Sequence, residues 1–167
     1  MKKAVLFDFA VDKDKQQIHV TRAFNGELAL VWRAWTEPEL LDQWWAPRPY
    51  TNHTKQLDLI PGGLWHYYMK SPAGEVHWCL FAYEAIHVQQ QYSGRDSFCD
   101  EQAQPSNALP GTHWTNTFID NQDGTTTVKV VLQYDSIEAL ETIVSMGFKE
   151  GFTMGLNQLD ELLVTLK

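Results

Sequence analysis

The sequence predicts an α+β fold in which a curved antiparallel sheet wraps a long C-terminal helix, with two short helices after the first strands. Three observations predict it. Strand-like segments joined by short polar turns fill most of positions 5–24 and 53–134. Two short segments with helical periodicity lie between them. Apolar residues then recur every three or four positions from 136 to 167. Short turns make neighbouring strands antiparallel, and the helix can cover one face of the sheet.

The first two strands are expected at Val5–Val11 and Gln17–Phe24, separated by the polar turn Asp12–Lys15. The pair Asn25–Gly26 is a turn signal that ends the second strand.

Two short helices are expected next. In Glu27–Trp35 the apolar residues fall at i, i+3, i+4 and i+7, which indicates an amphipathic helix. Thr36–Glu39 has the pattern of a capping box with proline in the first turn, so a second helix starts there. Pro47 and Pro49 end it.

The segment from 53 to 134 reads as a series of strands. Asn121–Gly124 is a strong hairpin signal, whereas Asp100–Gly111 is polar, contains two prolines and is expected to be a loop. The expected strands are Thr54–Ile60, Leu64–Lys70, Glu75–Val88, Gln89–Cys99, Thr112–Asp120 and Thr125–Tyr134.

The last segment, Ser136–Lys167, is expected to be one continuous helix capped by Asp135. Gly147, Gly151 and Gly155 lie four positions apart and would form a bare strip along one side. The strip either thins the helix where it faces a cavity or a close backbone, or Gly147 breaks the segment into two helices and the other glycines allow tight packing on the sheet.

Length and composition predict one domain, residues 1–167, located in the cytoplasm. The net charge is −8 and no Lys/Arg cluster is present, so nucleic acid and anionic membranes are not expected as partners. No apolar run approaches the ~20 residues that span a bilayer, and acidic residues interrupt the N-terminal segment, unlike a signal peptide. Cys79 and Cys99 are too few for a disulfide scaffold and are expected to be buried thiols.

Aromatic residues make up 13% of the chain and include seven Trp, which suits a thick core or the wall of a cavity. Strand alternation would turn about half of the strand aromatics away from any one face. The candidate ligand-binding residues are Trp44, Trp45, Trp65, Tyr67, Trp78, Phe81, Trp114, Phe118, Met146, Glu150, Met154 and Gln158.

No metal, cofactor or catalytic residue is predicted. The six histidines form no metal-binding pair on a helix, and His66 and His77 would have only Glu75 nearby. Cys79 has no electropositive neighbour that would make it a nucleophile. An acid–base site inside an apolar cavity stays open as an alternative; besides Glu150, its candidate residues are Tyr92, Arg95 and His113.

Several local motifs occur in an order that resembles the family of activator of Hsp90 ATPase homologue 1-like proteins, in the START-like or Bet v 1-like helix-grip superfamily. The resemblance extends from about Ile18 to Leu166. Its motifs are Thr36–Pro47, Pro61–Trp65 with Met69, Pro72–Gly74, Asp123–Thr126, Gly147–Phe152, Leu156 and Leu159–Leu163.

The resemblance implies a sheet of seven or so strands around the last helix, with a cavity between them that commonly binds apolar molecules. The strand Val5–Val11 and the insertion Asp100–Gly111 depart from the common pattern, and the insertion is expected near the cavity mouth. The expected function is binding of a small apolar molecule. The alternatives are a protein-interaction role and an enzyme of cyclase or hydrolase type. Hsp90 itself is not an expected partner, because a single domain lacks the companion domain of a full activator; a homodimer stays open.

Overall fold

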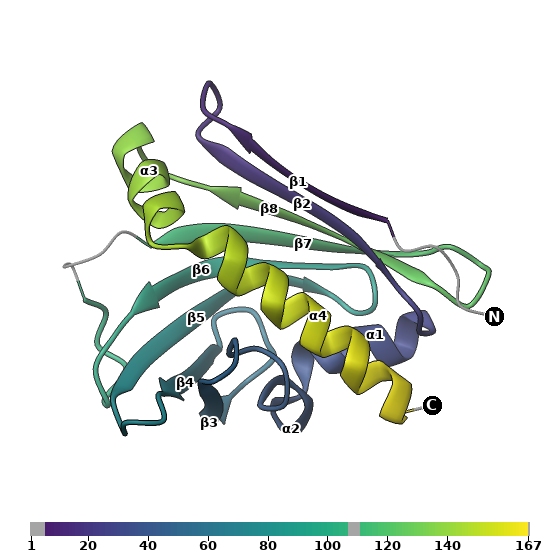
Figure 1. The fold of residues 1–167 in the computed structure, drawn as a ribbon, viewed down its shortest axis with the longest axis horizontal. Coiled ribbons are helices and arrows are strands. Elements are labelled where there is room, and N and C mark those ends of the chain that lie inside the picture. The colour runs from purple at the N-terminus through teal and green to yellow at the C-terminus, as the bar shows by residue number, and fades with distance from the viewer. Residues whose placement is uncertain (1–5, 107–110, 167) are drawn as a thin grey trace.

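Eight antiparallel strands form one curved sheet, and the long helix α4 crosses its concave face (Figure 1). The computed structural model describes residues 6–106 and 111–166. The strand order is β1-β2-β8-β7-β6-β5-β4-β3, and every neighbouring pair is antiparallel. The predicted α+β architecture is therefore confirmed, and the eight strands of the described residues agree with the seven or so that the resemblance implied.

Most elements lie close to their predicted positions, and Gln17–Phe24, Leu64–Lys70 and Thr112–Asp120 match residue for residue. The strands are β1 Phe7–Asp12, β2 Gln17–Phe24, β3 Thr51–Leu57, β4 Leu64–Lys70, β5 Val76–His87, β6 Gln91–Phe98, β7 Thr112–Asp120 and β8 Thr126–Gln133. The helices are α1 Leu28–Thr36, α2 Pro38–Leu41, α3 Ile137–Ser145 and α4 Phe148–Leu166.

The first and third strands are shifted from their predicted bounds. β1 begins at Phe7, and Val5 of the predicted strand lies outside the described residues. β3 begins and ends three residues earlier than the predicted Thr54–Ile60. The predicted end of that strand is used for the turn into β4, in which the Gly63 amide donates to Ile60 O at 2.8 Å.

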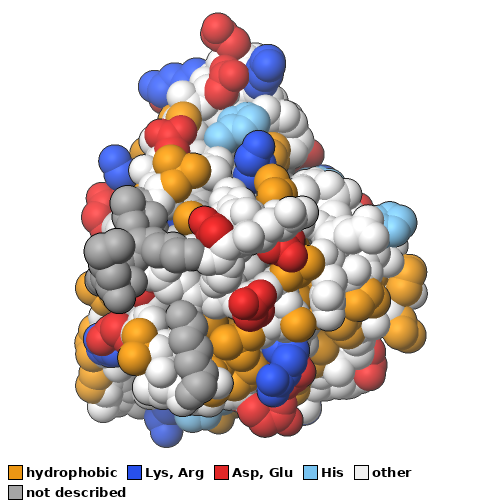
Figure 2. All heavy atoms as spheres, turned by 90° about the vertical axis from the view of Figure 1, so that its right-hand side faces the viewer, with side chains coloured by type: hydrophobic (Ala, Val, Ile, Leu, Met, Phe, Trp, Pro, Cys, Tyr) orange, Lys and Arg blue, Asp and Glu red, His pale blue; other side chains and the backbone are white. Residues whose placement is uncertain are grey.

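The surface shows no gathering of basic side chains on the face seen in Figure 2, where Lys and Arg are dispersed among Asp and Glu. This distribution agrees with the sequence, in which no Lys/Arg cluster occurs. Among the described helices, none has the length and apolarity needed to cross a membrane.

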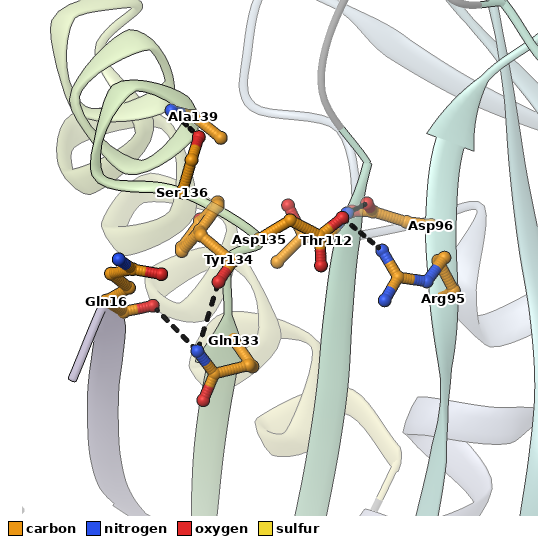
Figure 3. Close-up of polar contacts among 9 residues, drawn as sticks. All are labelled: Gln16, Arg95, Asp96, Thr112, Gln133, Tyr134, Asp135, Ser136 and Ala139. Atoms are coloured by element: carbon orange, nitrogen blue, oxygen red, sulfur yellow. Dashed lines mark hydrogen bonds and ion pairs between the residues drawn. The ribbon is translucent and has the colours of Figure 1, made fainter.

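Of the two alternatives for the glycine strip, the helix break is confirmed: the predicted continuous helix is divided at Gly147 into α3 and the long helix α4. Gly147 has φ +86°, a left-handed conformation that terminates a helix and that glycine adopts without steric cost. The cap of α3 also differs from the prediction: the Ser136 hydroxyl, not Asp135, accepts from the Ala139 amide at 3.0 Å (Figure 3). Asp135 instead forms an ion pair with Arg95 at 3.4 Å.

Helix α4 packs against the rest of the fold mainly through its C-terminal half. Leu156, Leu159 and Leu163 are at most 1% exposed, whereas Phe148 and Phe152 in the first turns are only partly buried. On β2, the buried Arg22 forms an ion pair with Asp160 of the same C-terminal half. A Cβ on Gly155 would lie 3.4 Å from Trp44 O and 3.5 Å from Trp45 O, so α4 packs closely at this position against the backbone after α2.

The buried side chain of Gln158 ties α4 to the segment that follows α2. Its Nε2 donates to Trp44 O at 2.9 Å and to Ala46 O at 2.8 Å. Its Oε1 accepts from the Arg48 amide at 2.9 Å. These three bonds, hereafter the Gln158 clamp, satisfy backbone groups of an irregular segment that would otherwise be buried without partners.

The glycines of α4 and its N-terminal junction provide a paired test of this geometry. Gly147→Ala should lower the free energy of unfolding by about 1 kcal/mol or more, because alanine is strained at positive φ. Gly151→Ala should raise it by about 0.5–1 kcal/mol, because an added Cβ meets only Pro47 Cγ, at 3.8 Å, and alanine favours the helix. Urea denaturation measures both changes. Stability changes of the same sign in the two variants would contradict the helix break at Gly147.

Removal of the Gln158 clamp should cost more than removal of an exposed glutamine. Gln158→Ala is expected to lower the free energy of unfolding by about 2–4 kcal/mol, because it leaves buried carbonyls unpaired. The matched control is Gln43→Ala, whose exposed side chain donates only to Glu39 O at 3.0 Å. That variant should stay within about 0.5 kcal/mol of wild type in the same denaturation experiment. Similar losses in both variants would show that the clamp contributes little.

Candidate ligand-binding pocket

A half-enclosed pocket of about 330 Å³ lies where the N-terminal half of α4 stands away from the sheet. Its walls come from strands β4 to β8, the junction of α3 and α4, and the segment after α2. The lining residues are Trp45, Pro47, Tyr67, Met69, Cys79, Asp96, Ser97, Phe98, Thr112, Trp114, Leu132, Tyr134, Ile143, Met146, Gly147, Phe148, Gly151 and Phe152.

Strand register brings the sheet residues of the pocket together. Tyr67 is the cross-strand partner of Cys79, and Asp96 is the cross-strand partner of Thr112. Two pairs of lining residues therefore lie side by side on neighbouring strands. Since alternate residues of a strand face the same side, Asp96 points to the same face as the buried Tyr92.

Aromatic rings form most of the wall nearest to α4. The ring centroids of Trp45 and Trp114 are 5.8 Å apart, and those of Trp114 and Phe152 are 5.6 Å apart. Phe148 and Phe152 stack at 5.2 Å on successive turns of α4. The Trp45 indole donates to the Tyr67 hydroxyl at 3.1 Å, which fixes the orientation of both side chains. The wall is therefore apolar with its few polar groups already held in place.

Asp96 carries the one carboxylate among the lining residues. Its Oδ1 accepts from the Thr112 amide at 2.9 Å, and its Oδ2 accepts from the Trp114 indole at 2.8 Å. Burial raises the pKa of Asp96 to about 6, because desolvation disfavours the charged form more than these hydrogen bonds favour it. Asp96 keeps some accessible surface because one side of it faces the pocket.

No ion pair among the described residues includes Asp96. The neighbouring cation, Arg95, is more than a third exposed and reaches toward Asp135, as the dashed line in Figure 3 shows. Its charge lowers the pKa of Asp96, but less than desolvation raises it. The carboxylate therefore faces an aromatic pocket without a cation paired to it in the described chain.

The other titratable groups on the wall are neutral at physiological pH. Burial raises the pKa of the Cys79 thiol to about 12, which disfavours the reactive thiolate form. Burial likewise raises the pKa of Tyr67 and of Tyr134. Both cysteines are free. The described residues contain no group of three or more His, Cys, Asp or Glu placed to hold a metal ion.

The structure brings Trp45, Tyr67, Trp114 and Met146 of the predicted candidates together on the pocket wall. The others lie elsewhere. Trp44, Trp65, Phe81 and Phe118 are packed in the core, Gln158 forms the clamp, and Glu150 and Met154 are exposed on α4. Trp78 lies on the opposite face of the sheet from Cys79, where its ring centroid is 4.7 Å from that of Tyr68.

Asp96 is the charged pocket residue that sequence reasoning missed, since Glu150, Tyr92, Arg95 and His113 were the acid–base candidates. Uncharged lining residues such as Leu132, Tyr134 and Ile143 were missed as well. His113 Nε2 forms a hydrogen bond with Glu84 Oε1 at 2.8 Å, outside the lining. The usable signal was strand parity: Asp96 lies an even number of positions from Tyr92 and Phe98, whereas Arg95 does not.

The described part of the predicted insertion, residues 100–106, contacts the convex side of the sheet. His66 Nε2 donates to Asp100 O at 3.0 Å, and Lys55 Nζ donates to Glu101 O at 2.9 Å. His66 follows the inward-facing Trp65 on β4 and therefore points outward. Residues 107–110 of the predicted insertion lie outside the described residues.

Comparisons with known proteins point to one family. The family model described as activator of Hsp90 ATPase homolog 1-like protein matches residues 26–164. The chain is similar to the crystal structure of protein Ms6760 from Mycobacterium smegmatis, with 31% identity and a TM-score of 0.86 over 96% of this chain and 97% of that one.

Two solution structures are also similar. The protein from Arthrobacter aurescens has 23% identity and a TM-score of 0.88 over 95% of this chain and 91% of that one, a likeness of fold. The protein from Staphylococcus epidermidis has 25% identity and a TM-score of 0.82 over 95% of each chain. Among curated proteins, none matches this chain in sequence. The family match covers well over half of the chain, so this protein belongs to the activator of Hsp90 ATPase homolog 1-like family and has the helix-grip fold of its structural neighbours.

Proposed function

We propose that this protein binds a small, mainly apolar molecule in the pocket between α4 and the sheet. One observation carries the proposal: a half-enclosed space of about 330 Å³ whose wall is aromatic and aliphatic except for a few oriented polar groups. Small-molecule sites in proteins have this composition, and their volumes run from roughly 300 to 1,000 Å³. The volume is at the low end of that range, which favours a compact ligand.

The surrounding structure supports a preformed site. Trp45 and Tyr67 are joined by a hydrogen bond, and the Gln158 clamp fixes the chain segment that carries Trp45 and Pro47. A ligand would therefore meet walls that are already ordered, so it would lose little of its binding free energy to ordering side chains.

The burial of the Asp96 carboxylate lowers the stability of the folded protein at neutral pH, which favours a role for this residue beyond packing. Its pKa of about 6, against the usual 3.8, means that the folded protein binds a proton more readily than the unfolded chain. Between these two values the folded state is protonated at Asp96 and the unfolded state is not. Its contribution to stability therefore falls as the pH rises through this window and stays low above it.

The pH dependence of stability tests the position of Asp96. Relative to Asp96→Asn, the wild type should lose about 2–3 kcal/mol of unfolding free energy between about pH 4 and pH 8. The difference between the two proteins is measured by urea denaturation across this range, so titrations common to both cancel. Parallel curves would mean that Asp96 has an ordinary pKa and is exposed to solvent.

Ligand binding itself is tested with a neutral compact probe, 4-phenylbutan-1-ol, by isothermal titration calorimetry. The wild type should bind the probe and gain thermal stability with increasing probe concentration. Gly151→Leu should weaken binding at least about tenfold, because Gly151 lines the pocket and a larger side chain there would occupy the ligand space.

The matched control is Met154→Leu on the same helix, since Met154 is 42% exposed and lies outside the lining. This control should bind like the wild type. If Gly151→Leu folds and binds the probe with unchanged affinity, the pocket is not the binding site.

A further inference from the structure

We propose that the preferred ligand carries a protonated amine on its apolar body and that Asp96 pairs with this amine inside the pocket. The inference rests on the proposed function and narrows it from apolar molecules in general to apolar cations. It is carried by the position of the Asp96 carboxylate, which has no cation paired with it in the described chain and lies among aromatic side chains.

The carboxylate of Asp96 has room for another donor. Its two hydrogen bonds come from the Thr112 amide and the Trp114 indole, and the Thr112 hydroxyl is a further nearby donor. A carboxylate offers about four acceptor positions, so at least one is left for a ligand on the side that faces the pocket. Because both protein partners hold the two oxygens in place, that position is fixed before a ligand arrives.

The protein supplies no positive charge to this position from the described residues that line the pocket. The titratable groups that face Asp96 are the neutral Tyr67, Cys79 and Tyr134. Arg95, the one cation of the described residues whose charge lowers the pKa of Asp96, lies on the outer side and pairs with Asp135. A buried anion without a cation is unfavourable, and a ligand ammonium would relieve this cost.

The aromatic wall of the pocket also favours a positively charged ligand. A cation is attracted to the faces of Trp, Tyr and Phe rings within about 6 Å. Trp114 joins the two features, since its indole donates to Asp96 and its ring lies 5.6 Å from that of Phe152. The remaining wall, including Met69, Ile143 and Leu132, is suited to the hydrocarbon part of the ligand. The net charge of −8 also attracts cations at long range.

The experiment compares three probes of equal length at pH 7.5 by calorimetry: 4-phenylbutylamine, 4-phenylbutan-1-ol and 4-phenylbutanoate. The wild type should bind the amine at least about tenfold more tightly than the alcohol, and the carboxylate most weakly. In Asp96→Asn the ratio of amine to alcohol affinity should fall to near one. The matched control Glu150→Gln removes an exposed negative charge of α4 outside the lining and should keep the wild-type ratio.

A second measurement needs no variant. At pH 6, where Asp96 is about half protonated, binding of the amine should release roughly half a proton, whereas binding of the alcohol should not. Calorimetry in two buffers of different ionisation enthalpy measures this release.

The outcomes separate the two proposals. If none of the three probes binds, the proposed function fails. If the alcohol or the carboxylate binds as tightly as the amine, or no proton is released, the pocket binds ligands but the inference is overturned. Uptake of a proton with the alcohol would show that Asp96 acts as a neutral hydrogen-bond donor instead.

Discussion

The position of α4 depends on an uneven set of attachments along its length. Its C-terminal half is held by the Gln158 clamp, by the close approach at Gly155 and by the ion pair of Arg22 with Asp160. At its N-terminal end, α4 is separated from α3 by the left-handed turn at Gly147. Beside its N-terminal half, where Phe148 and Phe152 are only partly buried, a space is left between the helix and the sheet. The pocket is this space, and its position follows from where the attachments are.

The same arrangement explains why one carboxylate can be kept inside an apolar site. Asp96 lies on β6, in the middle part of the sheet order, where its neighbours on β7 supply two hydrogen-bond donors. These donors are backbone or rigid indole groups, so the negative charge is oriented without a mobile cationic side chain. A flexible lysine in this place would fill the pocket and neutralise the charge, and the site would then have no preference for the charge of its ligand.

The sequence predicted the sheet well because strand signals are local. Alternation and turn residues define β2, β4 and β7 without reference to the rest of the chain. It left the helix break open, because Val144 and Phe148 keep the spacing of the apolar stripe across Gly147, so periodicity favours one helix whereas the glycine favours two. The family resemblance supplied the overall architecture, which no local pattern contains.

The pocket was less predictable because its membership is decided by tertiary packing. Trp44 and Trp45 are adjacent and chemically identical. Trp44 is nevertheless buried in the core, where its indole donates a hydrogen bond to Ala34 O, whereas Trp45 lies on the pocket wall. Met146 and Met154 flank the same glycines, but the chain turn at Gly147 separates their surroundings. Asp96 could have been found by strand parity, whereas its lack of a cation depends on where Arg95 reaches and is visible only in three dimensions.

The strand order also bears on how separate copies of the chain would meet. The sheet is open, with β1 and β3 at its two margins. β1 carries Asp8 and Asp12, and β3 carries Lys55 next to a register shift between Thr54 and Gln56. Charged side chains and bulges at a margin disfavour addition of another strand and so oppose aggregation. Self-association of this protein would therefore have to use side-chain surfaces, because extension of the sheet from copy to copy is disfavoured at both margins.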